Sequence, residues 1–345
     1  MLLYILNDAV VELTHKCNLS CLHCGSGCDE TTARGNEMSA DEWIDFIQQF
    51  HDIGARRVFF SGGEPTLKPG FCELLRTAHD CGLQFGFITN GFHFQDNLLE
   101  TMESCPPTAV GISIDGSPKV HNHIRQNQQS FRRVLKAVGQ LQDQKIDICA
   151  VTAVNRLNWN VLPTIGSLLN LAGVGNWQIQ IAMPFGRLAE HRELLIDEDM
   201  FKKVCDFLYH FRQDYPHIKT QAADCFAVAP ADVIRDEDWH SCGAGISGIG
   251  VDSEGNVLPC LSWWSPDFIC GSLRKQSLKS IWETSPGFDF NRKFDTNAVK
   301  GQNCAGCELL SECRGGCASL SLAFTGELHN SPFCYFRSFQ QGLMS

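Results

Sequence analysis

The sequence lacks long apolar runs and is short of basic residues. No uncharged apolar stretch approaches the ~18–20 residues that a membrane span requires. Residues 1–13 contain no basic segment and include Asp8 and Glu12, so we expect no signal peptide, no membrane partner and a cytoplasmic protein. The 28 basic residues stand against 39 acidic ones, for a formal charge of −11. This balance argues against nucleic acid as a partner.

What the sequence does contain is a globular composition with many cysteines. Hydrophobic residues make up 43% and charged residues 19% of the 345 positions, which excludes a mostly disordered chain. A chain of this length suggests one large domain and a smaller module. Without an export signal, the 18 cysteines are expected to bind metal or to carry out redox chemistry rather than to form disulfides.

Strand-like runs alternate with helix-like segments, which is typical of a parallel α/β sheet. A capping box at residues 39–42 predicts a helix over 41–50, Ser130 is expected to cap a helix over 131–142, and a third helix fits 199–212. We predict a partial (β/α)6 TIM-like barrel, although periodicity alone leaves a flat doubly wound sheet open. The six expected strands are 10–13, 58–60, 84–88, 110–114, 146–154 and 177–181.

The pattern of the sequence changes after about residue 220. Expected strands become shorter, glycine and cysteine become denser, and residues 250–258 predict a hairpin with a tight turn. We place a boundary between about 215 and 235. The predicted domains are a barrel over 1–220 and a small cysteine-rich module over 221–345.

Three cysteines follow the first expected strand with the spacing C-x3-C-x2-C. Cys17, Cys21 and Cys24 could hold three irons of a cubane cluster and leave the fourth iron without a protein ligand. A structural zinc ion would need a fourth nearby ligand. His15, His23 or Cys28 could supply it, so the spacing alone leaves zinc open.

This loop resembles the signature of the radical S-adenosylmethionine (SAM) enzymes, and further motifs occur in the expected order. Residues 61–65 read Ser-Gly-Gly-Glu-Pro and resemble the GGEP motif of that family. Each motif follows the carboxyl end of an expected strand, the edge at which parallel barrels build active sites. The other motifs are Thr89-Asn90-Gly91, Ser113-Ile114-Asp115-Gly116, Arg125, Asn155 and residues 184–187.

The resemblance implies a set of SAM contacts. The edge formed by Gly62, Gly63 and Glu64 would receive the amino group, and Arg125 would meet the carboxylate. His23 would lie near the adenine. Ser113 and Asp115, at the end of the fourth expected strand, would contact the ribose. Asn90, in the motif after the third expected strand, is the remaining candidate.

A second group of seven cysteines follows residue 241. CxxC knuckles are common zinc ligands, but seven cysteines do not divide into complete four-ligand zinc sites. The order and spacing resemble the SPASM extension of radical SAM enzymes, which holds two auxiliary 4Fe–4S clusters. The resemblance assigns one cluster to Cys304, Cys307, Cys313 and Cys334, and the other to Cys242, Cys260 and Cys317. The fourth ligand of the latter could be Cys225 or Cys270, or the position could be open.

The resemblance implies an enzyme with three 4Fe–4S clusters that generates a 5′-deoxyadenosyl radical from SAM. We expect a maturase that cross-links or otherwise oxidises a ribosomally made precursor peptide, with a flavodoxin or ferredoxin as electron donor. A separate protein could bind the leader peptide. The catalytic residues are not evident, and Cys28 is a weak candidate as hydrogen donor. Alternatives are a peptide epimerase, an oxidase of porphyrin-type small molecules, and a non-enzymatic iron–sulfur electron carrier.

Overall fold

The structure is a computed structural model that describes residues 4–226, 241–263, 265–301 and 303–338. A single ten-stranded sheet runs through it in the order β10-β9-β8-β1-β2-β3-β4-β5-β6-β7. Strands β1 to β8 pair in parallel, whereas β9 and β10 are antiparallel. The strands are β1 Asp8–Glu12, β2 Arg57–Ser61, β3 Gln84–Thr89, β4 Ala109–Ser113, β5 Ile148–Val154, β6 Asn176–Ile181, β7 Lys219–Ala222, β8 Gly248–Val251, β9 Asn256–Leu258 and β10 Gly271–Ser272.

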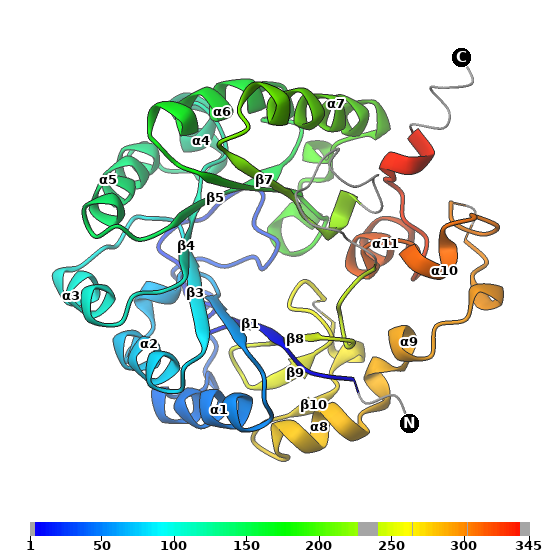
Figure 1. Cartoon of the computed structure of the whole chain (residues 1–345), viewed down its shortest axis with the longest axis horizontal. Helices are drawn as coiled ribbons and strands as arrows, with labels where there is room; N and C mark the ends of the chain where they lie inside the picture. Colours follow the sequence, from blue (N-terminus) through cyan, green and yellow to red (C-terminus); the bar gives the residue numbers. More distant parts are fainter. Residues whose placement is uncertain (1–3, 227–240, 264, 302, 339–345) are drawn as a thin grey trace.

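Helices cover the outer face of the curved sheet, as Figure 1 shows for α1 to α7. This arrangement confirms the predicted α/β class and TIM-like architecture, and all six expected strands are present. The first seven helices are α1 Ala40–Asp52, α2 Phe71–Asp80, α3 Asp96–Ser104, α4 Pro118–Ile124, α5 Ser130–Asp143, α6 Leu162–Leu171 and α7 Glu198–Asp214. The later ones are α8 Leu278–Thr284, α9 Asp289–Arg292, α10 Leu310–Cys313 and α11 Ala318–Thr325.

The helix start signals of the sequence are borne out at α1 but not at α5. At α1 the Ser39 hydroxyl accepts from the Glu42 amide, and the Glu42 carboxylate accepts from the Ser39 amide, so the capping box forms. At α5 the cap is Gln129, and Ser130 is the first helical residue with no capping bond. The prediction for Ser130 was wrong because its hydroxyl is instead engaged by the buried His121 ring, 3.0 Å away.

The C-terminal part of the chain continues the barrel sheet. Strand β8 pairs in parallel with β1, and β8 and β9 form the hairpin that the sequence predicts. Gly255 in its turn has φ +83°, a conformation that favours glycine. Strand β7, which the sequence did not reveal, pairs with β6 and contains residue 220.

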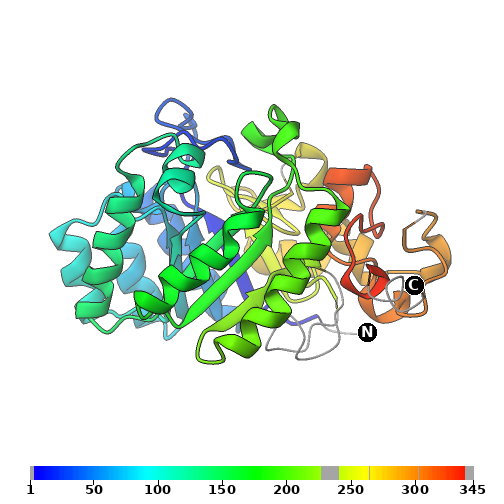
Figure 2. The same ribbon diagram turned by 90° about the horizontal axis from the view of Figure 1, so that it is seen from above.

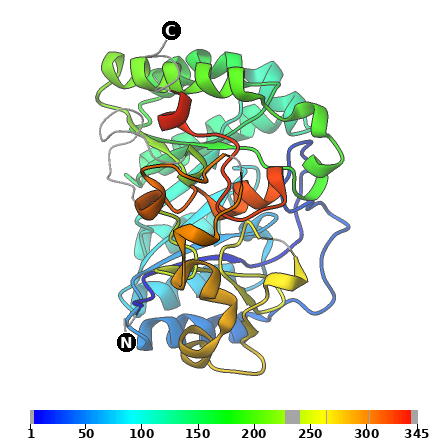
Figure 3. The same cartoon turned by 90° about the vertical axis from the view of Figure 1, so that its right-hand side faces the viewer.

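The cysteine-rich elements lie at one end of the molecule. In Figure 2, α10 and α11 are at the opposite end of the long axis from α3 and α5, and Figure 3 shows them from their own side. An ion pair between Arg274, in the segment between β10 and α8, and Glu42 connects the C-terminal part of the chain to α1. No helix among the residues that the structure describes is long and apolar enough to cross a membrane.

Candidate active site

The cysteine loop leaves the end of β1 and returns to its own start. The Cys17 amide donates to the Asp29 carbonyl at 3.0 Å, which closes the loop. Cys17, Cys21 and Cys28 are buried, and Cys24 packs against them. The loop therefore gathers three spaced thiols and Cys28 into one small apolar cluster.

The spacing of the thiols is wrong for zinc. Zinc–sulfur bonds of about 2.3 Å place the sulfurs of a tetrahedral site about 3.8 Å apart. Among the described His, Cys, Asp and Glu residues, the group whose ligand atoms all lie within 4.8 Å of one another is Glu12, His15 and Cys28. His15 has both ring nitrogens against carbonyls, of Thr32 at 3.0 Å and Ser26 at 2.9 Å, so neither is free for a metal. The described thiols form no group as tight as this, which disfavours a zinc ion held by Cys17, Cys21 and Cys24.

The Gly-Gly-Glu-Pro segment packs directly on the cysteine loop. The Gly63 amide donates to the Thr14 carbonyl at 2.8 Å. A Cβ on Gly62 or Gly63 would lie 2.5 or 2.3 Å from the carbonyl oxygens of Thr14 and Lys16. The absence of a Cβ at both glycines thus allows the backbones of the two loops to touch.

The Glu64 carboxylate is buried and fully engaged. Its oxygens accept from the hydroxyls of Thr66 and Thr89, each at 2.7 Å, and from the Asn90 amide at 2.8 Å. Burial raises the pKa of Glu64, and these donors oppose that shift. Glu64 therefore joins the ends of β2 and β3.

Asp115, after β4, brings two other expected SAM residues, Arg125 and His23, to its buried carboxylate. Arg125 Nε and Nη2 donate to Oδ2 at 2.7 and 2.6 Å, and His23 Nε2 lies 3.3 Å from the same oxygen. Burial opposes ionisation, but Arg125 and His23 hold the pKa of Asp115 well below its usual range. The group is an ionised carboxylate that fixes both partners.

One ring nitrogen of His23 has no partner among the described residues. Nδ1 is buried and makes no hydrogen bond, whereas Nε2 faces Asp115. An unsatisfied buried nitrogen is unfavourable unless a ligand supplies the missing hydrogen bond. The position of His23 therefore fits the adenine contact expected for it, and Ser113 ends β4 immediately beside this group.

Two supporting residues of Asp115 were not identified from the sequence. His121 Nδ1 accepts from the Asp115 amide at 3.2 Å, and burial lowers the His121 pKa to about 3. The side-chain Nδ2 of Asn158 donates to the Asp115 backbone carbonyl at 3.1 Å. The signal available was that both positions, like Asp115 itself, follow expected strands.

Arg187 clamps the cysteine loop from the far side of the barrel mouth. It follows β6, within the motif at 184–187, and its Nη1 donates to the Cys21 carbonyl at 2.9 Å. Its Nη2 meets the carbonyls of Gly27 and Cys28, both at 3.3 Å, and forms an ion pair with Asp29 at 3.0 Å. The sequence marked the motif but not this role.

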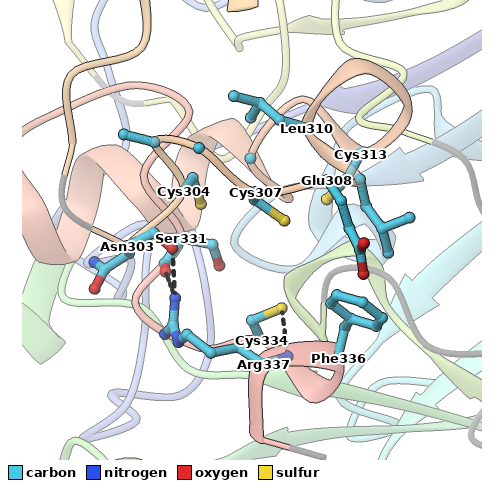
Figure 4. Close-up of a pocket in the computed structure, with 14 residues that line it drawn as sticks. Asn303, Cys304, Cys307, Glu308, Leu310, Cys313, Ser331, Cys334, Phe336 and Arg337 are labelled. Carbon is cyan, nitrogen blue, oxygen red and sulfur yellow. Dashed lines mark hydrogen bonds between the residues drawn. The ribbon is translucent and has the colours of Figure 1, made fainter. Parts of the chain in front are cut away.

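Four cysteines of the C-terminal module line one cavity of about 430 Å³. In Figure 4 the sulfur atoms of Cys304, Cys307, Cys313 and Cys334 turn towards the same space, with Arg337 and Phe336 at its edge. The Arg337 amide donates to Cys334 Sγ at 3.5 Å. Burial raises the pKa of the Cys304 and Cys334 thiols.

The second set of module cysteines includes Cys225. Cys317 is buried, and burial is the main reason that the pKa of its thiol is raised. The charges of Cys242, Cys225 and Cys260 raise this pKa further, so their sulfurs interact electrostatically with Cys317. Cys270 has other partners. Its sulfur contacts the Phe268 carbonyl and Ser285, and burial raises its pKa to about 12.

Comparison with known families agrees with this geometry. The model of the radical SAM superfamily matches residues 11–160, which contain the cysteine loop and the motifs around Asp115. The chain therefore contains a radical SAM domain. The model of the SPASM iron–sulfur cluster-binding domain matches residues 242–308. The protein is therefore a radical SAM enzyme with a C-terminal SPASM domain, and these two domains imply iron–sulfur clusters and SAM binding.

Relatives of full length carry two different names. The "AdoMet-dependent heme synthase" of Nitratidesulfovibrio vulgaris is 27% identical over 342 residues, covering 94% of this chain and 91% of the relative. The "PqqA peptide cyclase" of Rhizobium meliloti is 25% identical over 335 residues, covering 94% and 86%.

Two solved structures share the fold. The crystal structure of Streptococcus suis SuiB bound to SAM has a TM-score of 0.76 at 16% identity, covering 96% of this chain and 76% of SuiB. Native anSMEcpe with bound AdoMet also has a TM-score of 0.76 at 16% identity, covering 98% and 96%.

Proposed function

We propose that the protein is a peptide maturase that oxidatively modifies a ribosomally synthesised precursor. The observation that carries the proposal is that two cysteine sets face the same end of the barrel. The cysteine loop follows β1, and Cys225 Sγ accepts from the amide of Ile181, the last residue of β6. In α11, Ser319 meets Met183 Sδ, just beyond β6, at 3.6 Å. A substrate in the barrel mouth would lie between the two sets.

We assign three 4Fe–4S clusters to these sets. Cys17, Cys21 and Cys24 would hold the cluster that binds SAM. Cys304, Cys307, Cys313 and Cys334 would hold one auxiliary cluster, and Cys242, Cys260 and Cys317 the other. The electrostatic interaction of Cys225 with Cys317 supports Cys225 as its fourth ligand.

The protein would mainly position SAM and exclude water. When bound, SAM and its cluster supply a 5′-deoxyadenosyl radical that removes a substrate hydrogen atom. Asp115 fixes Arg125 for the SAM carboxylate and His23 for the adenine. Gly62, Gly63 and Glu64 shape the loop that would receive the amino group, Ser113 and Asp115 would contact the ribose, and Asn90 links this loop to the thiols.

A second electron path favours a net oxidation. An auxiliary cluster beside the substrate would accept the second electron. With one hydrogen atom taken by the deoxyadenosyl group and one proton released from the attacking group, a new bond would form with loss of two hydrogens in total. A flavodoxin or ferredoxin would supply the electron that starts the reaction. Peptides are the substrate class of several fold relatives: SuiB was solved with precursor peptide SuiA and anSMEcpe with a peptide, and one sequence relative is a peptide cyclase.

The cluster assignment is tested with two cysteine variants. Anaerobically reconstituted wild-type protein should hold about twelve irons per chain. Cys225→Ala should change the electron paramagnetic resonance (EPR) spectrum of one auxiliary cluster and speed its loss of iron to a chelator. The matched control, Cys270→Ala, should change neither. Equal spectra and equal rates in Cys225→Ala and wild type would contradict the assignment.

The substrate class is tested by mass spectrometry. The enzyme, SAM and reductant are incubated with each short peptide that reading frames beside its gene are found to encode, and we expect a loss of two hydrogens per modification of the cognate peptide. An unchanged mass with one deuterium gained in heavy water would indicate epimerisation instead. SAM cleavage with no change in the peptide would contradict the proposal.

A tetrapyrrole substrate is the second candidate. The observation that favours it is the similarity, over 94% of the chain, to heme synthases from two further organisms at 26% identity as well as to the one above. In the same assay a carboxylated tetrapyrrole would be consumed and the peptide left unchanged. Consumption of the peptide alone would exclude this candidate.

A further inference from the structure

One stretch of this acidic chain carries positive charge only. Residues 116–142, which contain α4 and α5, include five lysines and arginines and no aspartate or glutamate, in a chain whose formal charge is −11. Arg125 of this stretch is paired with Asp115. The other four are exposed and form no ion pair within the described residues: Lys119, Arg132, Arg133 and Lys136. Helix α3, in contrast, contains three acidic residues and no basic one.

Three of these charges share one face of α5. Arg132 and Arg133 precede Lys136 by four and three residues, and side chains at these spacings are neighbours on a helix surface. Leu135, three residues after Arg132, is 47% exposed, so apolar surface lies within the same face. We call these four residues the basic face. Charged side chains around an apolar contact are the usual anatomy of a surface at which two proteins meet.

The basic face adjoins the outside of the cysteine loop. The Arg133 guanidinium lies 5.1 Å from the centre of the Phe92 ring, and Phe92 packs against the buried cysteines of the loop. At the end of α4, the Ile124 carbonyl accepts from the Leu22 amide of the loop at 2.9 Å. Arg133 and Phe92 thus connect the basic face to the thiols expected to hold the SAM-binding cluster.

We propose that the basic face is the docking surface of an acidic one-electron carrier protein that reduces the SAM-binding cluster. The inference rests on the proposed function, which requires one electron to start each reaction. If the carrier is a flavodoxin, its flavin hydroquinone would become a semiquinone, and the electron released would reduce the cluster, with no atom transferred.

Charge complementarity supports this partner. Opposite charges on two protein surfaces raise the rate of their encounter. The net charge of −11 would otherwise repel an acidic carrier, so a local basic surface beside the cluster would direct where it binds. Complexes of redox partners bury small areas, which fits a contact made mainly by one helix.

The test compares wild type with two charge-reversed proteins. Arg132→Glu/Lys136→Glu reverses two charges of the basic face and keeps Arg133. The matched control, Lys275→Glu/Lys279→Glu, makes the same change in net charge at two exposed lysines beside the start of α8. Each full-length protein is reconstituted anaerobically and its iron is counted. Cleavage of SAM is then started either with an acidic flavodoxin in the hydroquinone form or with reduced methyl viologen, a small cation that needs no basic surface.

We expect the charge reversal on the basic face to slow the reaction with flavodoxin alone. At limiting flavodoxin and low salt, Arg132→Glu/Lys136→Glu should cleave SAM about tenfold more slowly than wild type, because repulsion replaces attraction. Raising the salt from about 0.02 M to about 0.5 M should narrow this difference, because salt screens exposed charges. The control should match wild type, and with methyl viologen all three proteins should be equally fast.

Four results would overturn the inference. Equal rates with flavodoxin in all three proteins would remove the role of the basic face, and an equal fall in the control would reduce the effect to net charge. Slower cleavage with methyl viologen as well would mean that the two residues support the cysteine loop. Normal rates with flavodoxin but poorer modification of the peptide would assign the face to an acidic segment of the substrate. If charge reversal lowers the iron content, Arg132→Gln/Lys136→Gln removes the charges without reversing them, and the same comparison decides.

Failure of the inference and failure of the proposed function are distinguishable. A wild-type protein that cleaves no SAM with methyl viologen would overturn the cluster assignment, and the inference with it. A wild-type protein that cleaves SAM with methyl viologen but takes no electron from flavodoxin would overturn the inference alone.

Discussion

Replacing Asp115 by Asn removes one charge from the centre of the site and keeps the shape of the side chain. Asp115 has no exposed surface, and its Oδ2 accepts from two nitrogens of Arg125. The Arg125 side chain is 12% exposed, so its guanidinium would lose its carboxylate partner in a largely dry place. Breaking a buried ion pair in this way costs about 3–5 kcal/mol.

This cost converts into a shift of the unfolding midpoint. At about 2.1 cal/mol/K per residue, a chain of this length has an unfolding entropy of about 0.7 kcal/mol/K. Asp115→Asn should therefore unfold about 4–7 °C below wild type in anaerobic scanning calorimetry of the cluster-loaded protein, if the chain unfolds cooperatively. The matched control is Asp8→Asn, whose partner Arg57 is 54% exposed. An exposed pair contributes little, so the control should shift by about 1 °C or less.

The pH dependence of this shift follows from the low pKa of Asp115. A carboxylate with a depressed pKa stabilises the fold fully above its unfolded value of about 3.9, and the stabilisation is lost as the pH falls towards the folded value. The difference between wild type and Asp115→Asn should therefore be equal at pH 6 and pH 8. An unfolding midpoint for Asp115→Asn within about 1 °C of that of the control would refute the buried ion pair as a major source of stability.

Two further replacements probe how the loop is held. Gly63→Ala places a methyl group 2.3 Å from the Lys16 carbonyl oxygen, so the loop must shift at a cost of about 1–3 kcal/mol. The iron content of this variant should therefore fall. Gly35→Ala, with no atom within 4 Å of the added carbon, should match wild type. Arg187→Ala removes the clamp and should speed iron loss to a chelator severalfold, whereas Arg156→Ala, whose partners lie outside the loop, should not. Normal iron in Gly63→Ala, or equal rates in the two arginine variants, would contradict these roles.

The sheet and its active edge could be predicted because their signals are local. Alternating strand and helix patterns give six parallel strands in chain order, and the motifs mark their carboxyl ends. The capping box at Ser39 and Glu42 depends on four consecutive residues and forms as expected. Strand β7 is short and follows a long helix, so its four residues carry too weak a pattern to be recognised.

Roles that depend on distant partners could not be predicted. The Ser130 hydroxyl follows a capping pattern, but the fold brings the His121 ring within 3.0 Å of it. An added Cβ at position 62 or 63 would meet carbonyl oxygens nearly fifty residues earlier in the chain, a contact that no local pattern shows. Arg187 reaches the loop across more than 150 residues. Local pattern therefore identifies these residues, while the fold decides what each one touches.

The same long-range contacts affect how variants of the site are to be interpreted. Arg125 donates both to Asp115 and to Cys21, so replacing it alters the expected SAM contact, a buried ion pair and a thiol together. A fall in activity in Arg125→Ala therefore does not by itself measure SAM binding. SAM binding measured directly in Arg125→Ala, with the iron of the variant counted beside it, separates the loss of the expected SAM contact from damage to the cysteine loop.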